Sequence, residues 1–182
     1  MKNNYIFTSQ RLGFRNWKDA DLDIYAAMNA NTDVMQYFPT LMTQEESKAS
    51  IEKFNSQFQE LGYTYYAVDE LESGEFIGFI GLSWKDFESS FTPATDIGWR
   101  LKPSAWGKGY ATEGAQRCLA YAFEVLKLEK VIAICPEVNT PSERVMQKIG
   151  MKLQGAFKHP FLKDYPHLER CLCYAIASNE FQ

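Results

Sequence analysis

The stretch from Trp106 to Thr112 constrains this chain most, because it sets two glycines between a predicted strand and a predicted helix. Gly107 and Gly109 flank Lys108 and allow the backbone to approach a ligand without interference from a Cβ atom. Free backbone N–H groups at a helix start, reinforced by the helix dipole, bind phosphate oxygens. The stretch is neither a G-x-x-x-x-G-K-[ST] loop nor a G-x-G-x-x-G turn, since Thr112 stands where the second pattern needs glycine. Taken alone, it predicts either a phosphate-binding helix start or an ordinary glycine-rich turn.

The apolar periodicity along the chain alternates between a strand-like and a helix-like period. No repeat or long linker divides the sequence, so we expect one domain spanning residues 1–182. The order of elements predicts an α/β (α+β) protein in which an antiparallel meander feeds a β-α-β-α-β half, with about seven strands and about four helices. The strands are predicted over residues 6–15, 63–69, 75–84, 95–101, 128–135, 151–158 and 171–177.

Capping residues and glycines set the limits of the four predicted helices. These signals are local, because a capping side chain and the amide that it binds lie within one helical turn. The helices are predicted from Asp19 or Asp21 to residues 31–33, from the Thr43–Glu46 capping box to Gly62, from near Lys108 to Leu126, and from Ser142 to Gly150.

The composition argues against several classes of protein. The formal net charge is −4, whereas a general nucleic-acid binder is more often basic. No apolar segment approaches the ~20 residues needed to span a bilayer, so we expect no membrane association. The four cysteines show no C-x-x-C spacing and there are only two histidines, which argues against a zinc site. We expect reduced, structural thiols in a cytoplasmic protein that holds no metal and is a monomer or homodimer.

Four blocks of the sequence carry a family resemblance that covers nearly the whole chain. They are Thr8–Arg15 with Trp17 and Asp19–Asp21, Asp96–Trp99 with Leu101 and Pro103, Trp106–Gly114, and Asn139 with Ser142 and Val145–Met151. Together they resemble the GNAT superfamily of N-acetyltransferases and, within it, the RimJ/RimL branch of ribosomal-protein N-terminal acetyltransferases. Two positions depart from the family pattern: Trp106 takes the place of the usual Gln or Arg, and Met151 takes that of the usual Phe.

The resemblance implies a twisted, mostly antiparallel sheet with a central pair of parallel strands, 95–101 and 128–135, that splay apart. It also implies acetyl-CoA as the cosubstrate, and no metal. The pantetheine arm would then pair with the backbone of Trp99, Arg100 and Leu101, and Asn139 would add a contact. The pyrophosphate would lie on the turn and helix start formed by Gly107, Lys108, Gly109, Tyr110, Ala111 and Thr112.

Acetyl transfer to an amine needs a proton acceptor, because a free α-amine titrates near ~8 and must be neutral to attack. Asp96 is the candidate base, acting through a water; its alternative role is that of a solvated carboxylate at a strand end. The resemblance implies that Ser142 protonates the departing thiolate. Alternatively, Ser142 is an early residue of a helix capped by Asn139 or Thr140. Tyr37 and Phe38 are candidate walls of the acceptor groove.

The function that the resemblance implies is transfer of an acetyl group from acetyl-CoA to a primary amine, by direct attack in a ternary complex. The first choice of acceptor is the α-amine of a protein or peptide N-terminus. One alternative acceptor is a small amine, either a polyamine or an aminoglycoside-like compound. Another alternative is a non-catalytic domain that senses acyl-CoA, since a fold does not by itself fix a function.

Overall fold

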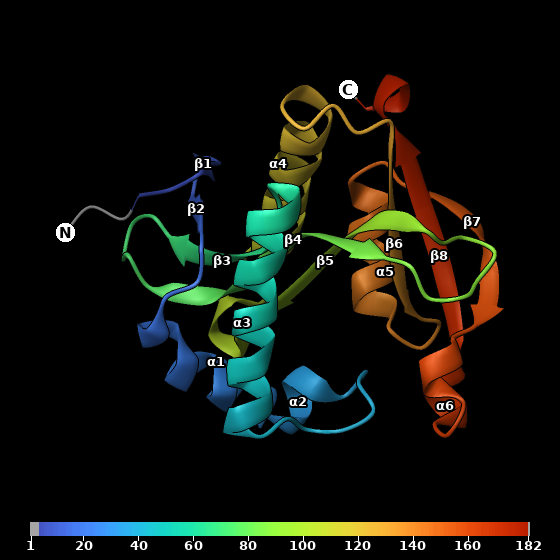
Figure 1. Ribbon diagram of the computed structural model, residues 1–182, viewed down its shortest axis with the longest axis horizontal. Coiled ribbons are helices and arrows are strands. Elements are labelled where there is room, and N and C mark those ends of the chain that lie inside the picture. Colours follow the sequence, from blue (N-terminus) through green and yellow to red (C-terminus); the bar gives the residue numbers. More distant parts are fainter. Residues whose placement is uncertain (1–3, 182) are drawn as a thin grey trace.

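One open, eight-stranded sheet runs through the chain, in the order β1-β2-β3-β4-β5-β6-β8-β7 (Figure 1). The computed structural model describes residues 4–181. The strands are β1 (Phe7–Thr8), β2 (Leu12–Arg15), β3 (Tyr65–Glu70), β4 (Phe76–Lys85), β5 (Ala94–Leu101), β6 (Lys130–Pro136), β7 (Lys152–Lys158) and β8 (Arg170–Ala177). The α-helices are α1 (Leu22–Asn29), α2 (Thr32–Met35), α3 (Gln44–Leu61), α4 (Tyr110–Glu124), α5 (Thr140–Lys148) and α6 (Pro166–Glu169).

The predicted mixed sheet is confirmed, with three differences in the number of elements: one further strand and the two short helices α2 and α6. The first predicted strand is a hairpin, because the chain turns where the Ser9 N–H donates to the Leu12 carbonyl and β1 then pairs antiparallel with β2. The second difference is at Asn31, which was expected to help end a helix. Its side chain instead accepts hydrogen bonds from the amides of Asp33 and Val34, and so starts the short helix α2.

The start of α1 corrects another expectation. Neither Asp19 nor Asp21 caps this helix, because residues 19–21 form a 3-10 turn and α1 begins at Leu22 without a side-chain cap. By contrast, the capping box of α3 is confirmed. Glu46 donates its amide to the Thr43 hydroxyl, and its carboxylate accepts from the Thr43 amide.

The sheet opens between its two central parallel strands. β4 and β5 pair antiparallel along the whole of β5, and β6 and β8 do the same along β6. In contrast, β5 and β6 share a single paired position, Asp96 with Ile132. Beyond Asp96 the two strands diverge, so the β6-facing backbone of β5 from Ile97 to Leu101 has no strand partner. This is the splayed pair that the family resemblance implies.

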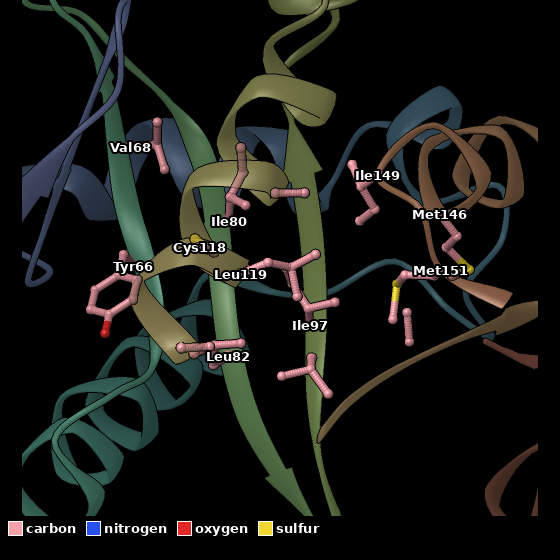
Figure 2. Close-up of a cluster of buried hydrophobic side chains, with 14 of the residues drawn as sticks. Tyr66, Val68, Ile80, Leu82, Ile97, Cys118, Leu119, Met146, Ile149 and Met151 are labelled. Carbon is pink, nitrogen blue, oxygen red and sulfur yellow. The ribbon is translucent and has the colours of Figure 1, made fainter. Parts of the chain in front are cut away.

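The two largest of the three apolar clusters pack on opposite faces of the sheet. On one face, Ile80, Leu82 and Ile97 pack against Cys118 and Leu119 of α4 (Figure 2). On the other face, Trp17, Tyr25, Phe76 and Phe79 form a cluster that Phe54 of α3 joins. Paired residues of neighbouring strands share a face, and Phe79 pairs with Arg100 while Ser83 pairs with Asp96. Asp96, Gly98 and Arg100 therefore lie on the α1–α3 face, opposite Ile97.

Residues 4–181 contain no helix that combines the length and apolar character needed to cross a bilayer. Within the same range, no three His, Cys, Asp or Glu side chains come together as a metal site would require. The four cysteines are buried and carry no disulfide bond. Burial raises the pKa of each of these thiols well above its usual range, so they act as apolar packing groups.

A buried charge network joins β2, β3 and the 3-10 turn before α1. The Arg15 guanidinium donates to Asp21 at 2.7 and 2.8 Å and to Asp69 at 2.7 and 2.8 Å. All three side chains are at most 5% exposed. Burial by itself lowers the pKa of Arg15, but the hydrogen bonds that Arg15 donates to the two carboxylates, together with their charges, raise it by more, so the charged form is held. This is why Asp21 is unavailable to cap α1.

Replacing Arg15 with Met should lower the free energy of unfolding by about 3–5 kcal/mol, because two buried carboxylates lose their counter-charge. The control is Lys152→Met, which breaks the exposed Lys152–Glu180 pair and should cost less than about 1 kcal/mol. Urea denaturation of both variants measures the difference. Similar small losses in the two would show that the buried network contributes no more than a surface pair.

Candidate active site

A cavity of about 470 Å³ lies where β5 and β6 diverge. Its walls come from β5 and β6, the start of α5, the turn before α4, and the segment from Asp33 to Phe38. Strands and helices distant in sequence therefore meet at one opening. Of the residues predicted from the sequence, those that line the cavity are Tyr37, Phe38, Asp96, Trp99, Arg100, Leu101, Ala111, Asn139 and Ser142. Gly107, Lys108, Gly109, Tyr110 and Thr112 lie next to it, in the turn and first helical residues that lead to Ala111.

The turn before α4 leaves backbone donors free. Gly107 and Gly109 have φ angles of 73° and 81°, in the left-handed region that favours glycine. Gly109 is the N-cap of α4, and no side chain caps the helix there. The first N–H groups of a helix have no acceptor within the helix, so the amides of residues 110–112 are available to a ligand. An anion is the chemistry that such a helix start binds.

Two cations lie at this helix start. Lys108 is within the turn, and Arg11 reaches it from the turn between β1 and β2. Arg11 donates to the Lys108 carbonyl at 3.0 Å and pairs with Glu113 at 2.6 Å. Its guanidinium also lies 4.6 Å from the centre of the Tyr110 ring. No local sequence pattern indicates this placement of Arg11, because it brings together residues about a hundred positions apart.

Tyr110 points away from the cavity. Its ring is buried in the α4-face cluster, and its hydroxyl donates to Glu70 of β3. Only the backbone amide of Tyr110 is therefore in position to bind a ligand at the helix start. Glu113, the first-turn acid, accepts from Ser9 and Arg11 and holds the β1–β2 turn against α4.

The structure gives a role to Trp106, which stands where the family pattern usually has Gln or Arg. Its indole N–H donates to the Leu101 carbonyl at 2.7 Å, and its ring, 45% exposed, lines the cavity. The Leu101 carbonyl was expected to be free for a ligand, but it already has this partner. The backbone groups of β5 that remain available to a ligand are therefore mainly those of residues 97–100.

Asp96 lies where the two strands begin to part. It is 5% exposed, so the alternative of a solvated strand-end carboxylate is wrong. Burial raises its pKa to about 6, although the charge of Lys85, the hydrogen bond from Tyr65 and the Ile134 backbone act in the opposite direction. The Tyr65 hydroxyl donates to Asp96 at 2.5 Å. Tyr65 and Lys85 also line the cavity, although no local sequence pattern predicts a functional role for either residue.

Asn139 and Ser142 form the opposite wall. Asn139 is the N-cap of α5, since its side-chain oxygen accepts from the Ser142 amide at 3.2 Å, so Thr140 is not the cap. The Ser142 side chain is half-buried and faces the cavity. Its hydroxyl makes no hydrogen bond to any of residues 4–181 and is therefore open to a ligand.

The raised pKa of Asp96 predicts how stability depends on pH. Between its unfolded pKa near ~3.9 and its folded pKa of about 6, the native state binds the extra proton, so raising the pH lowers the free energy of unfolding. Asp96→Asn has no such proton. Between about pH 4 and about pH 8 this variant should gain roughly 3 kcal/mol on the parent protein. Urea denaturation at both pH values measures the gain; a constant difference would contradict the raised pKa.

Comparison with known proteins identifies the family to which this fold and site belong. Residues 11–152 match the model of the acetyltransferase (GNAT) domain. The chain is 32% identical over 152 residues to YnaD of Bacillus subtilis, an uncharacterized N-acetyltransferase, covering 83% of this chain and 85% of YnaD. It is also 32% identical to a solved GNAT-family acetyltransferase from Bacillus anthracis, with a TM-score of 0.78 over 95% of this chain and 98% of that one.

Two more distant structures share the fold. One is RimL, a ribosomal L7/L12 α-N-protein acetyltransferase in complex with CoA, with a TM-score of 0.77, 19% identity, and coverage of 96% of this chain and 98% of RimL. The other is the spermidine N-acetyltransferase of Vibrio cholerae in complex with CoA and spermine, with a TM-score of 0.72, 19% identity, and coverage of 93% and 97%. The two act on different kinds of amine, so the shared fold leaves the acceptor open.

Proposed function

This chain belongs to the acetyltransferase (GNAT) family, and we propose that it transfers the acetyl group of acetyl-CoA to the α-amine of a protein or peptide N-terminus. The observation that carries the proposal is the single cavity that joins the free amides of the α4 start to the buried carboxyl of Asp96. The proposal takes residues 1–182 as one domain of the RimJ/RimL-like branch, working in the cytoplasm.

The residues present fit acetyl-CoA. The amides of residues 110–112, with Lys108 and Arg11 beside them, suit its pyrophosphate. The unpaired backbone of β5 around Trp99 suits the amides of its pantetheine arm. When bound, acetyl-CoA supplies the activated thioester; the protein supplies the groups that move protons and position the acceptor.

Two side chains have the chemistry for proton transfer. With its pKa at about 6, Asp96 is mostly ionised at neutral pH and can accept a proton from the attacking amine, directly or through a water. Ser142, on the other wall, has a free hydroxyl that can donate to the departing sulfur. A backbone N–H of β5 beyond Asp96 can stabilise the charge that develops on the carbonyl oxygen.

The charges of the cavity support an N-terminal α-amine over a polyamine. Asp33 and Asp96 are balanced by Lys85 and Arg100 along the same walls. A polycation is recognised best by an excess of carboxylates, which these walls do not have. A small amine with one positive charge would still fit this balance, and it is the second candidate acceptor.

Binding of CoA tests the cosubstrate. Gly109→Val puts a β-branched residue at a φ of 81° and should displace the α4 amides, weakening CoA binding by at least about tenfold. Gly74→Val is the matched control, because Gly74 has a φ of 71° and nothing near its Cβ position, but lies in the β3–β4 turn. Calorimetric titration of CoA into both variants gives the answer. Unchanged affinity in Gly109→Val would remove the basis of the proposed site.

Kinetics test the two proton-transfer roles. Thiol release from acetyl-CoA, measured with a panel of N-terminal peptides and small amines, should depend on the acceptor. Ser142→Ala should lower kcat about a hundredfold or more while leaving CoA affinity intact. Asp96→Asn should lower kcat as well, and its activity should no longer rise with pH near pH 6. Ser50→Ala, on the exposed side of α3, is the control. Tight CoA binding without turnover on any amine would instead favour the acyl-CoA sensor.

A further inference from the structure

Arg100 lines the cavity, and its guanidinium has no carboxylate partner among residues 4–181. Its Nη1 donates to the Asn29 side-chain oxygen at 2.6 Å, and its guanidinium carbon lies 4.1 Å from the centre of the Phe38 ring and 5.5 Å from that of Phe79. Nε is shielded from solvent and has no hydrogen-bond partner. Nη2 also has no acceptor among residues 4–181. Nη2 is not among the shielded atoms, so it is the nitrogen of the guanidinium that can donate to a carboxylate of a ligand.

Arg100 has no counter-charge of its own. Asn29 is a neutral partner, and no ion pair forms between Arg100 and any carboxylate in the described chain. The contrast is with Arg15, which is buried between two aspartates. Burying a guanidinium without a carboxylate is unfavourable, and burial accordingly lowers the pKa of Arg100. An anion supplied by a ligand would give Arg100 the counter-charge that the protein does not provide, and would thereby stabilise the buried guanidinium.

The guanidinium is held in place before any ligand binds. Asn29 is fully buried, and its amide donates to the Ser47 hydroxyl at 3.0 Å. Ser47 in turn donates to the Thr43 carbonyl at 2.8 Å, at the start of α3. The chain of hydrogen bonds thus anchors Arg100 to two helices. Such preorganisation reduces the loss of conformational freedom when an anion binds.

Arg100 and the proposed base face the same space. Asp96 and Arg100 are four residues apart on β5, which separates their Cα atoms by about 13 Å on one face of the strand. Gly98 lies between them, and a Cβ there would be 3.0 Å from the Tyr65 hydroxyl. Because Gly98 has no side chain, it leaves room for Tyr65 and places no side chain between Asp96 and Arg100 on this face of β5. The other charged groups on this cavity are Asp33 and Lys85.

We propose that the acceptor amine carries a carboxylate, which accepts a hydrogen bond from Nη2 of Arg100 while the amine lies toward Asp96. This inference rests on the proposed acetyl transfer and specifies its substrate class. The carboxylate has two possible sources: an acidic side chain at the first or second position of a peptide N-terminus, or the free α-carboxylate of an amino acid. Both present the same group to Arg100, and the experiment distinguishes them.

Matched acceptor pairs test the inference with the unaltered enzyme. The peptide amides Ala-Glu-Ala-NH2 and Ala-Gln-Ala-NH2 differ only in a carboxylate, as do phenylalanine and phenylalaninamide. At least one carboxylate-bearing member should have a kcat/KM about tenfold to a hundredfold above that of its neutral partner. Amidation lowers the basicity of the neighbouring amine, so amine reactivity alone favours phenylalaninamide. A preference for phenylalanine therefore cannot come from the pKa of the amine.

Variants assign the preference to Arg100. Arg100→Gln should reduce the ratio of kcat/KM within the preferred pair to about 1, mainly through KM, and Arg100→Lys should retain part of it. Arg170→Gln makes the same change of charge on the surface, where Arg170 pairs with Glu137, and should keep the ratio. Equal or faster turnover of both neutral acceptors by the unaltered enzyme would overturn the inference and leave acetyl transfer standing. No turnover of any amine would instead contradict the proposed function.

Discussion

The divergence of β5 from β6 after one paired position is the constraint on which the rest of the structure depends. A parallel strand that loses its neighbour exposes backbone groups, and the sheet compensates by full antiparallel pairing on the outer sides, β4 with β5 and β8 with β6. The chain leaves β5 into the turn before α4 and leaves β6 toward α5. Both helices therefore begin at the edges of the same opening. The site is a consequence of topology before any side chain is considered.

The alternation of side chains along β5 separates stability from chemistry. Ile97 is buried in the α4-face cluster with Leu82 and Leu119, which fixes the strand in the sheet (Figure 2). Asp96 and Arg100 lie on the opposite face, where aromatic rings reduce their contact with water. A strand with a rigid apolar side can hold charged groups on its other side within a narrow range of positions. That is what a site that moves a proton needs.

The sequence predicted the parts of this structure that depend on near neighbours. The capping box at Thr43 and the glycine turn at residues 107–109 are local, and the order of strands and helices followed from periodicity. Contacts between segments that lie far apart in the sequence could not be predicted. Nothing near Asp21 in the sequence indicates that Arg15 and Asp69 will bury it, and nothing near Trp106 indicates that its indole will bind the Leu101 carbonyl. Placing these side chains requires the assembled sheet.

The same limit explains why the charge balance of the cavity could not be predicted. Arg15 and Arg100 are both arginines on strands, yet one is neutralised by two aspartates and the other lies between aromatic rings with a neutral amide partner. The difference follows from the partners at each position, which are Asp21 and Asp69 around Arg15, but Asn29 and aromatic rings around Arg100. Arg15 has its counter-charges within the fold, whereas Arg100 beside the cavity has only a neutral partner and keeps a donor for the carboxylate that we propose. With the Asp96 carboxyl and the Arg100 guanidinium on one face of β5, the cavity would select the acceptor that we propose by the spacing of its amine and its carboxylate.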